Sequence, residues 1–265
     1  MGKNVNRLVI LMYHALYEDE RGLQEIPSED RPYALSTAEF AAHLDLLQAS
    51  GVPIADPHRL ELGDGLEPGI MLSFDDGHAS HTELALPLLV ERGLTAVFLV
   101  TTGFVNTRPG YCSWQQIERL CQAGMTVGGH GHTHRFLSDL TDAELANELS
   151  QSRNLLEDAL GRSITQLSFP GGRHDSRSER AARAAGYRVL YGSRVGWLRT
   201  GSPAPACVLP RMAVRRGATA SQVLAYANAG PTRMLRARLA FELKRLVRQL
   251  LGNERYHKLY ARLKG

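Results

Sequence analysis

The sequence has few cysteines and no long apolar run. Its three cysteines, Cys112, Cys121 and Cys207, are an odd number without C-x-x-C spacing. This pattern argues against a disulfide scaffold or a zinc ribbon and favours a reducing compartment. The apolar stretch from Leu8 to Met12 is too short for the core of a signal peptide. No run approaches the roughly 18 residues of a membrane span. These absences predict a cytoplasmic protein.

The net charge is small but unevenly distributed. The 265 residues include 31 Lys and Arg against 27 Asp and Glu, a formal charge of +4. Residues 231–265 hold ten of these bases and two acids, with leucines at helical spacing, whereas residues 1–230 are net acidic. A basic amphipathic helix either lies on an anionic membrane surface or packs on the fold with its bases solvated. Nucleic acid is not an expected partner, because the rest of the chain is acidic and lacks a sequence motif for nucleic-acid recognition. We therefore expect a domain over 1–230 and a basic helical tail over 231–265.

Short apolar runs alternate with helix signals from residue 36 onward. Capping-box patterns begin at Ser36, Ser113, Thr141 and Ser176. The apolar runs are continuous rather than alternating, as in parallel strands that are buried on both faces. This order predicts an α/β fold with right-handed strand–helix–strand units. A closed or nearly closed barrel is favoured, with a doubly wound open sheet as the alternative. The seven predicted strands are 8–14, 69–76, 95–102, 125–130, 166–171, 188–193 and 207–214.

Ionisable residues gather where two of these strands end. Asp75 and Asp76 follow the second strand, and His130 and His134 follow the fourth. Two histidines four residues apart on one helical turn, joined by a carboxylate, make a three-ligand metal site with open positions for water and substrate. Adjacent carboxylates at a strand end point different ways, so Asp76 can bind the metal while Asp75 stays free as a base. A bound divalent ion then supports hydrolysis of an amide or an ester.

Each pattern alone has an ordinary structural explanation. Asp-Asp-Gly is often only a turn, and two histidines at this spacing are more often surface or core residues than ligands. The joint occurrence of an acidic pair and a histidine cluster at strand ends is what favours a catalytic metal site.

The motifs together resemble the polysaccharide deacetylase family, the NodB-homology domain of carbohydrate esterase family four. The resembling blocks are ILMYH, LSFDDG, ALPLLVERGLTAVFLV, GMTVGGHGHTHRFL, LSFPGG and LPRMAV. The resemblance implies a distorted (β/α)7 barrel of the TIM-barrel kind and removal of N-acetyl groups from N-acetylhexosamine residues. It also implies a divalent metal, zinc before cobalt, nickel or manganese. Carried over to this sequence, it makes Asp75 the catalytic base and Asp76, His130 and His134 the metal ligands.

The sequence departs from the family pattern at three blocks. Ser168 stands where the family usually has an arginine that orients the base, and the next block lacks its frequent aspartate. The last block lacks the histidine that protonates the leaving amine, a contribution worth about 10²–10⁴-fold. We favour His14, which recurs in the YH-opening branch of the family, over His174 as the replacement acid. Arg211 is the candidate to replace the missing arginine beside Asp75.

The sequence therefore predicts a metal-dependent N-deacetylase that acts on an N-acetylated sugar, carried by a glycan, a lipid or a nucleotide. We expect it in the cytoplasm, with residues 231–265 as a peripheral contact to the inner face of the membrane. Two alternatives stay open. One is deformylation, or hydrolysis of another amide, on the same scaffold. The other is a degenerate, non-catalytic module that binds a glycan or a membrane partner.

Overall fold

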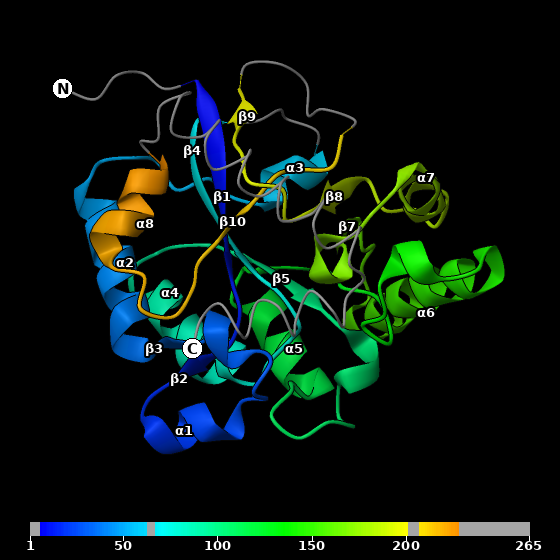
Figure 1. Ribbon diagram of the computed structural model, residues 1–265, viewed down its shortest axis with the longest axis horizontal. Coiled ribbons are helices and arrows are strands. Elements are labelled where there is room, and N and C mark those ends of the chain that lie inside the picture. The colour runs from blue at the N-terminus through cyan, green and yellow to red at the C-terminus, as the bar shows by residue number, and fades with distance from the viewer. Residues whose placement is uncertain (1–5, 63–66, 201–206, 228–265) are drawn as a thin grey trace, which may run out of the picture.

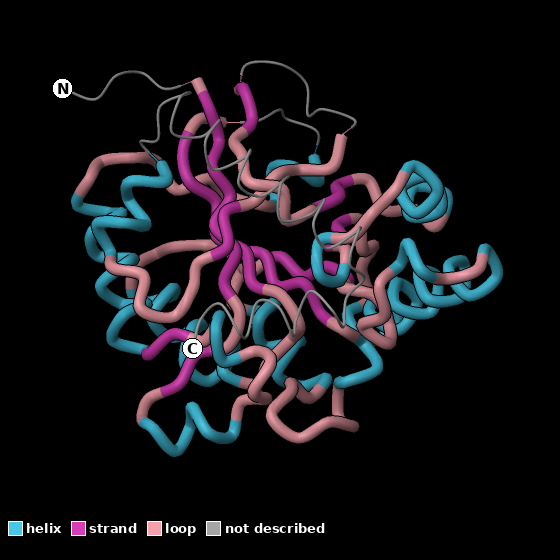
Figure 2. The backbone as a smooth tube through the Cα atoms, viewed as in Figure 1, coloured by secondary structure: helices cyan, strands magenta, loops and turns pink. Residues whose placement is uncertain are grey.

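The computed structural model describes residues 6–62, 67–200 and 207–227. At its centre lies a curled parallel sheet with helices packed around it (Figures 1 and 2). The strand order is β10-β1-β4-β5-β6-β7-β8, and every neighbouring pair on this path is parallel. Each strand lies inside one of the predicted runs, except that β1 begins one residue before its run, at Arg7. The strands are β1 (Arg7–Tyr13), β4 (Gly69–Phe74), β5 (Val97–Val100), β6 (Thr126–Gly129), β7 (Gln166–Ser168), β8 (Val189–Tyr191) and β10 (Met212–Ala213).

The segment that contains β10 joins the two edges of this sheet. Leu209 forms a parallel bridge with Tyr191 of β8, and three residues later Met212 pairs with Leu11 of β1. The strand order therefore runs around the sheet without the reversal that defines a doubly wound fold. The fold is a distorted (β/α)7 barrel, as the sequence predicted.

The main helices begin where the sequence places their caps. Ser36, Ser113 and Thr141 each form a complete capping box. The fourth prediction was wrong by one residue, because Asp175 rather than Ser176 caps its helix, accepting from the backbone N–H of Ser178 at 2.7 Å. The helices are α1 (Glu20–Glu25), α2 (Thr37–Ala49), α3 (His58–Leu62), α4 (Leu86–Glu91), α5 (Trp114–Gln122), α6 (Asp142–Leu160), α7 (Ser176–Ala184) and α8 (Ala220–Ala227).

Both faces of the strands are buried, as continuous apolar runs require. Ile10 of β1 packs in one cluster with Leu99 of β5, whereas its neighbour Leu11 packs in a second cluster with Phe40 and Leu44 of α2. Burial of each such side chain contributes about 1.5–3 kcal/mol.

A segment between β1 and α2 carries structure that the sequence did not predict. It contains α1, the short helix η1 (Arg31–Tyr33), and the strands β2 (Leu16–Tyr17) and β3 (Leu35–Ser36), which pair in parallel. Strand β9 (Leu198–Arg199) is a further addition and runs antiparallel to the start of β1. The remaining short helices are η2 (His81–Ala85), η3 (Thr102–Phe104), η4 (Leu137–Asp139) and η5 (Pro170–Gly172).

The predicted tail over 231–265 lies outside the described residues, as does the boundary at residue 230. Among the helices of the described ranges, none has the length and apolar character needed to cross a membrane.

Candidate active site

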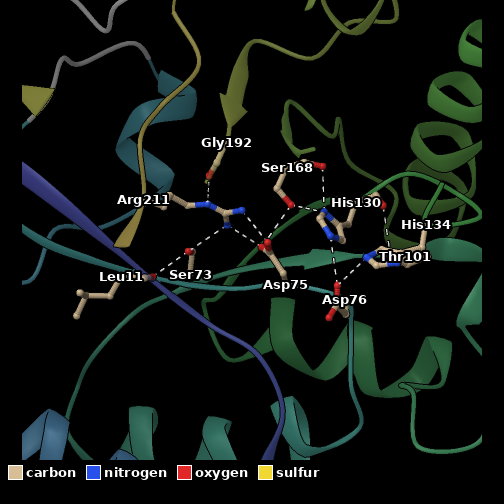
Figure 3. A network of polar contacts seen from close by, with 10 residues as sticks. All are labelled: Leu11, Ser73, Asp75, Asp76, Thr101, His130, His134, Ser168, Gly192 and Arg211. Atoms are coloured by element: carbon tan, nitrogen blue, oxygen red, sulfur yellow. Dashed lines mark hydrogen bonds and ion pairs between the residues drawn. The ribbon is translucent and has the colours of Figure 1, made fainter. Parts of the chain in front are cut away.

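Polar side chains from several strands meet beyond the carboxyl end of the sheet (Figure 3). Asp75 and Asp76 directly follow β4, His130 directly follows β6, and Ser168 ends β7. Arg211 comes immediately before β10 and reaches the group from the closing edge of the barrel. Because parallel strands end on the same side, residues more than 130 positions apart in the chain become neighbours here.

Asp76, His130 and His134 form a group able to hold a metal ion. Asp76 Oδ1 lies 3.2 Å from Nε2 of His130 and 3.2 Å from Nε2 of His134. Two ligand atoms on a tetrahedral ion with bonds of about 2.0–2.1 Å lie about 3.3 Å apart, so the spacing fits zinc. The other ring nitrogen of His130, Nδ1, donates its N–H to the carbonyl oxygen of Ser168 at 3.0 Å. This bond leaves Nε2 as the ligand atom.

The two ligand histidines converge through an irregular turn. The predicted helical turn for these two histidines is wrong, because residues 130–134 are not helical. Instead Asp76 and His134 have left-handed backbones, with φ of 80° and 63°. Residues other than glycine rarely adopt this region, and holding one there costs of order 1–3 kcal/mol. The surrounding structure must therefore supply the energy that keeps the group together.

Asp75 points away from Asp76 and forms a buried ion pair with Arg211. Arg211 Nη1 lies 2.7 Å from Asp75 Oδ1, and Nη2 lies 2.6 Å from Oδ2. Arg211 is 1% exposed and Asp75 3%, so the pair is almost entirely removed from water. The guanidinium is itself fixed by a hydrogen bond from Nε to the Gly192 carbonyl oxygen at 2.8 Å and by Ser73 Oγ. Both oxygens of the Asp75 carboxylate are thereby held in one orientation.

The electrostatic surroundings keep both carboxylates ionised. Burial acts to raise the pKa of Asp76, but hydrogen bonds with His130 and His134 outweigh it and hold the pKa well below its usual value. Burial also acts to raise the pKa of Asp75, and the charges of Arg211 and His130 outweigh it, so this pKa is lowered too. A metal ligand and a general base must both be deprotonated to work.

Ser168 links the two carboxylate environments. Its Oγ donates to Asp75 Oδ1 at 3.3 Å and also contacts His130 Nδ1. The family resemblance implies an arginine at the position of Ser168, but the guanidinium that contacts Asp75 comes from the β10 side and belongs to Arg211, the predicted replacement.

His14 follows β1 directly and lies on the Asp75 side of the site. Strands β1 and β4 pair in register up to their last residues, which places His14 beside Asp75. The imidazole packs against the ring of Tyr33 of η1 with centroids 4.9 Å apart. Burial lowers the pKa of His14, while the charges of Asp76 and Asp75 act to raise it. The His14 imidazole is therefore near enough to both carboxylates to interact with their charges.

The other candidate histidines are held by different partners. His174 Nδ1 lies 2.8 Å from Glu179 Oε1 of α7. His132, which lies between the two ligand histidines in sequence, contacts Thr102 Oγ1 through its Nδ1 at 3.0 Å.

His81, on the helix that follows the Asp-Asp-Gly motif, makes acid-dependent stability testable. Its ring is fully buried against Phe74 and Phe98, and burial lowers its pKa to about 3. Below the ordinary pKa of about 6.5, the imidazole of His81 is protonated in the unfolded chain but stays neutral in the native protein. Its contribution to the free energy of unfolding is therefore complete above that pH and is lost as the pH falls toward 3. Between about pH 7.5 and 5.5 we expect the wild type to lose about 1.4 kcal/mol more than His81→Gln. Urea unfolding in chelator measures this difference, and parallel pH profiles of the two proteins would contradict it.

Three residues near the site were missed from the sequence. Burial raises the pKa of Asp30 to about 6, and the charges of Asp76 and Glu29 add to the effect. Tyr33 covers His14, and Glu148 of α6 accepts hydrogen bonds from the turn that carries His134. Asp30 and Tyr33 belong to the unpredicted segment between β1 and α2, where the Asp30-x-Pro32 turn is a local signal. Glu148 stands in an ordinary helical pattern.

Comparisons with known proteins agree with this geometry. Residues 63–190 match the family model for polysaccharide deacetylase. YxkH of Bacillus subtilis, named as a candidate polysaccharide deacetylase, is 24% identical over 188 residues, which cover 69% of this chain and 63% of YxkH. The peptidoglycan-N-acetylmuramic acid deacetylase PdaA of the same organism is 33% identical over 89 residues, about a third of each chain. The structure of IcaB from Ammonifex degensii superposes with a TM-score of 0.69 at 27% identity, covering 84% of this chain and 97% of IcaB.

The fold and site define a (β/α)7 barrel with an Asp-His-His cluster able to bind a metal. Over residues 63–190 the chain matches the polysaccharide deacetylase family model, so it is similar to that family there. It spans less than two thirds of the length of the two curated relatives described above.

Proposed function

We propose that this protein is a metal-dependent N-deacetylase of an N-acetylated sugar. The observation that carries the proposal is the divergence of two adjacent carboxylates at the end of β4. Asp76 faces His130 and His134, whereas Asp75 faces Arg211 (Figure 3). The two residues at the end of β4 can therefore supply a metal ligand and a separate base to one site.

The donor set of two imidazoles and one carboxylate suits zinc, and each imidazole nitrogen lies at about the tetrahedral ligand spacing from the carboxylate oxygen. When bound there, a divalent ion polarises the acetyl carbonyl and acidifies water. Asp76, His130 and His134 would hold the ion, and Ser168 fixes the ring of His130 through its carbonyl oxygen.

Asp75 is proposed to remove the proton from the attacking water. Its pKa is lowered by Arg211 and His130, so it is ionised and available as a base at neutral pH. The bidentate pair with Arg211 fixes the plane of the carboxylate, which limits the directions from which a proton can be taken. Arg211 is proposed as the residue that orients the base in place of the family's usual arginine.

His14 is proposed to protonate the leaving amine, and a leaving-group test separates this role from packing. An amine is expelled poorly without a proton, whereas a nitrophenolate leaves readily. We expect His14→Ala to slow acetate release from an N-acetyl sugar by about 10²–10⁴-fold, with a much smaller effect on 4-nitrophenyl acetate. Steady-state kinetics on both substrates, with zinc content measured in each protein, checks this. Equal losses on the two substrates, or normal amide turnover, would remove His14 from the role.

The substrate is proposed to be an N-acetylhexosamine unit carried by a glycan, a lipid or a nucleotide. PdaA, by its name, acts on an N-acetylated sugar of peptidoglycan, which supports this class. A cytoplasmic location and a membrane contact through residues 231–265 remain proposals from the sequence.

Product analysis separates the proposed reaction from its two alternatives. Zinc-loaded protein is incubated with N-acetylated and N-formylated hexosamine oligomers, and released acids and free amines are quantified by NMR. Acetate with one free amine per acetate supports deacetylation. Formate alone supports a deformylase, and no release from either series, together with binding of the oligomers, supports a non-catalytic module.

A further inference from the structure

The turn that carries His134 forms hydrogen bonds with one buried carboxylate. Glu148, on α6, is 6% exposed. Its Oε1 accepts from the backbone N–H of His132 at 2.7 Å and of Thr133 at 2.6 Å. The Thr133 hydroxyl also donates to this carboxylate, at 3.1 Å to Oε1 and 3.0 Å to Oε2. A charged acceptor of this kind makes hydrogen bonds of about twice the usual strength.

The opposite side of the same turn is fixed by backbone donors. Thr102 N donates to the Gly131 carbonyl oxygen at 3.2 Å, and Gly103 N donates to that of His132 at 2.8 Å. The fit is tight, since a Cβ at Gly103 would lie 2.4 Å from the His132 oxygen. The carbonyl groups of the turn therefore face η3 while its N–H groups face α6. Within the described residues, Glu148 is the acceptor that holds the second side.

Glu148 also sits close to the backbone that bends after His130. Gly131 has φ of 75°, and a Cβ there would lie 3.0 Å from Glu148 Oε1. His134, three residues later, is itself left-handed. The chain thus passes from one ligand to the other through a bend in which Glu148 accepts hydrogen bonds from His132 and Thr133 and leaves little room for a side chain at Gly131. Glu148 itself is not in the ligand group.

We propose that Glu148 is a positioning residue for the metal: its carboxylate fixes the turn so that His134 Nε2 meets His130 Nε2 and Asp76 Oδ1 at one point. The inference rests on the metal site of the proposed function. The energy that holds His134 in its unfavourable backbone comes in part from these hydrogen bonds. Without them the turn relaxes, and the metal must reorder it on binding.

Two conservative variants separate the effect of the Glu148 side-chain length from the effect of its charge. Glu148→Gln keeps an oxygen for both N–H groups and offers its amide N–H to the Thr133 hydroxyl, so it preserves the geometry without the charge. Glu148→Asp keeps the charge but is one methylene too short. Competition with a chromophoric chelator gives zinc affinity directly, with no need for activity. We expect Glu148→Asp to weaken zinc binding by about 10–100-fold, the usual effect of losing an outer-shell partner, and Glu148→Gln to stay within about threefold of wild type.

Glu157→Ala is the matched control. Glu157 lies on the same helix and its side chain also accepts from a backbone N–H, that of Ile164, at 2.8 Å. This hydrogen bond does not involve residues 131–134, the turn that carries His134. We expect it to lower the melting temperature in chelator without changing zinc affinity. Wild-type affinity in Glu148→Asp, or an equal loss in Glu157→Ala, would overturn the role of Glu148 while leaving the metal site intact. Failure of the wild type to bind zinc would overturn the metal site itself, and the role of Glu148 with it.

Discussion

Replacing Asp75 by Asn will reduce acetate release by about 10²–10⁴-fold, the usual contribution of a general base, while zinc stays bound. Asn has nearly the shape of Asp but cannot take a proton from water. Asp76, His130 and His134 are untouched, so the metal group keeps its ligands. The measurement is acetate release under saturating substrate, with zinc content determined on the same sample.

The buried partner of Asp75 dictates the control for this experiment. Breaking a buried ion pair by removing one member typically costs about 3–5 kcal/mol, because the remaining charge is left without compensation. Asn leaves one oxygen to accept from Arg211, so it is preferred to Ala. Melting curves show whether the variant is folded at the assay temperature. A folded, zinc-loaded Asp75→Asn protein with activity within tenfold of wild type would remove Asp75 as the base.

Replacing His134 by Asn will lower zinc affinity by more than about 100-fold, beyond what loss of an outer-shell partner costs. His134 is the most exposed of the three candidate ligands, with a side chain 35% exposed, so its loss disturbs packing least. Asn tolerates a left-handed backbone better than most residues and so preserves the turn. Its amide is not among the ligands that zinc normally takes in proteins.

His132→Ala is the control for this second experiment. His132 lies in the same turn, and its ring contacts Thr102 rather than the ligand group. We expect its loss to change zinc affinity by only a few-fold. An unchanged affinity in His134→Asn, or an equally large loss in His132→Ala, would show that the metal is held differently.

Local sequence patterns were sufficient for a parallel α/β fold and for the two motifs at its centre, and the family resemblance was needed to choose the barrel over an open sheet. Continuous apolar runs mark strands buried on both faces, and cap residues act on their own next turn, so both can be read from neighbours in sequence. The placement of Asp75 and His130 at strand ends follows from the same patterns. Arg211 was inferred from a missing arginine, and the structure brings it to Asp75.

The parts that sequence did not predict depend on contacts between distant segments. Glu148 accepts hydrogen bonds from His132 and Thr133, which lie 15 or more positions earlier in the sequence. Nothing in the sequence of its own helix distinguishes it from a solvated residue. Asp30 and Tyr33 come from a segment of short elements, whose weak periodicity gives no signal. The left-handed backbone at His134 replaced the expected helical turn because η3 and Glu148 hold the loop from both sides.

The most direct test is acetate release as zinc is returned to chelator-treated protein. If Asp76, His130 and His134 hold one ion that the reaction needs, activity on an N-acetylhexosamine oligomer will be absent without metal. It will then rise linearly with added zinc and stop rising at one ion per chain. Full activity in the chelated protein, or a rise that ignores this stoichiometry, would contradict the account.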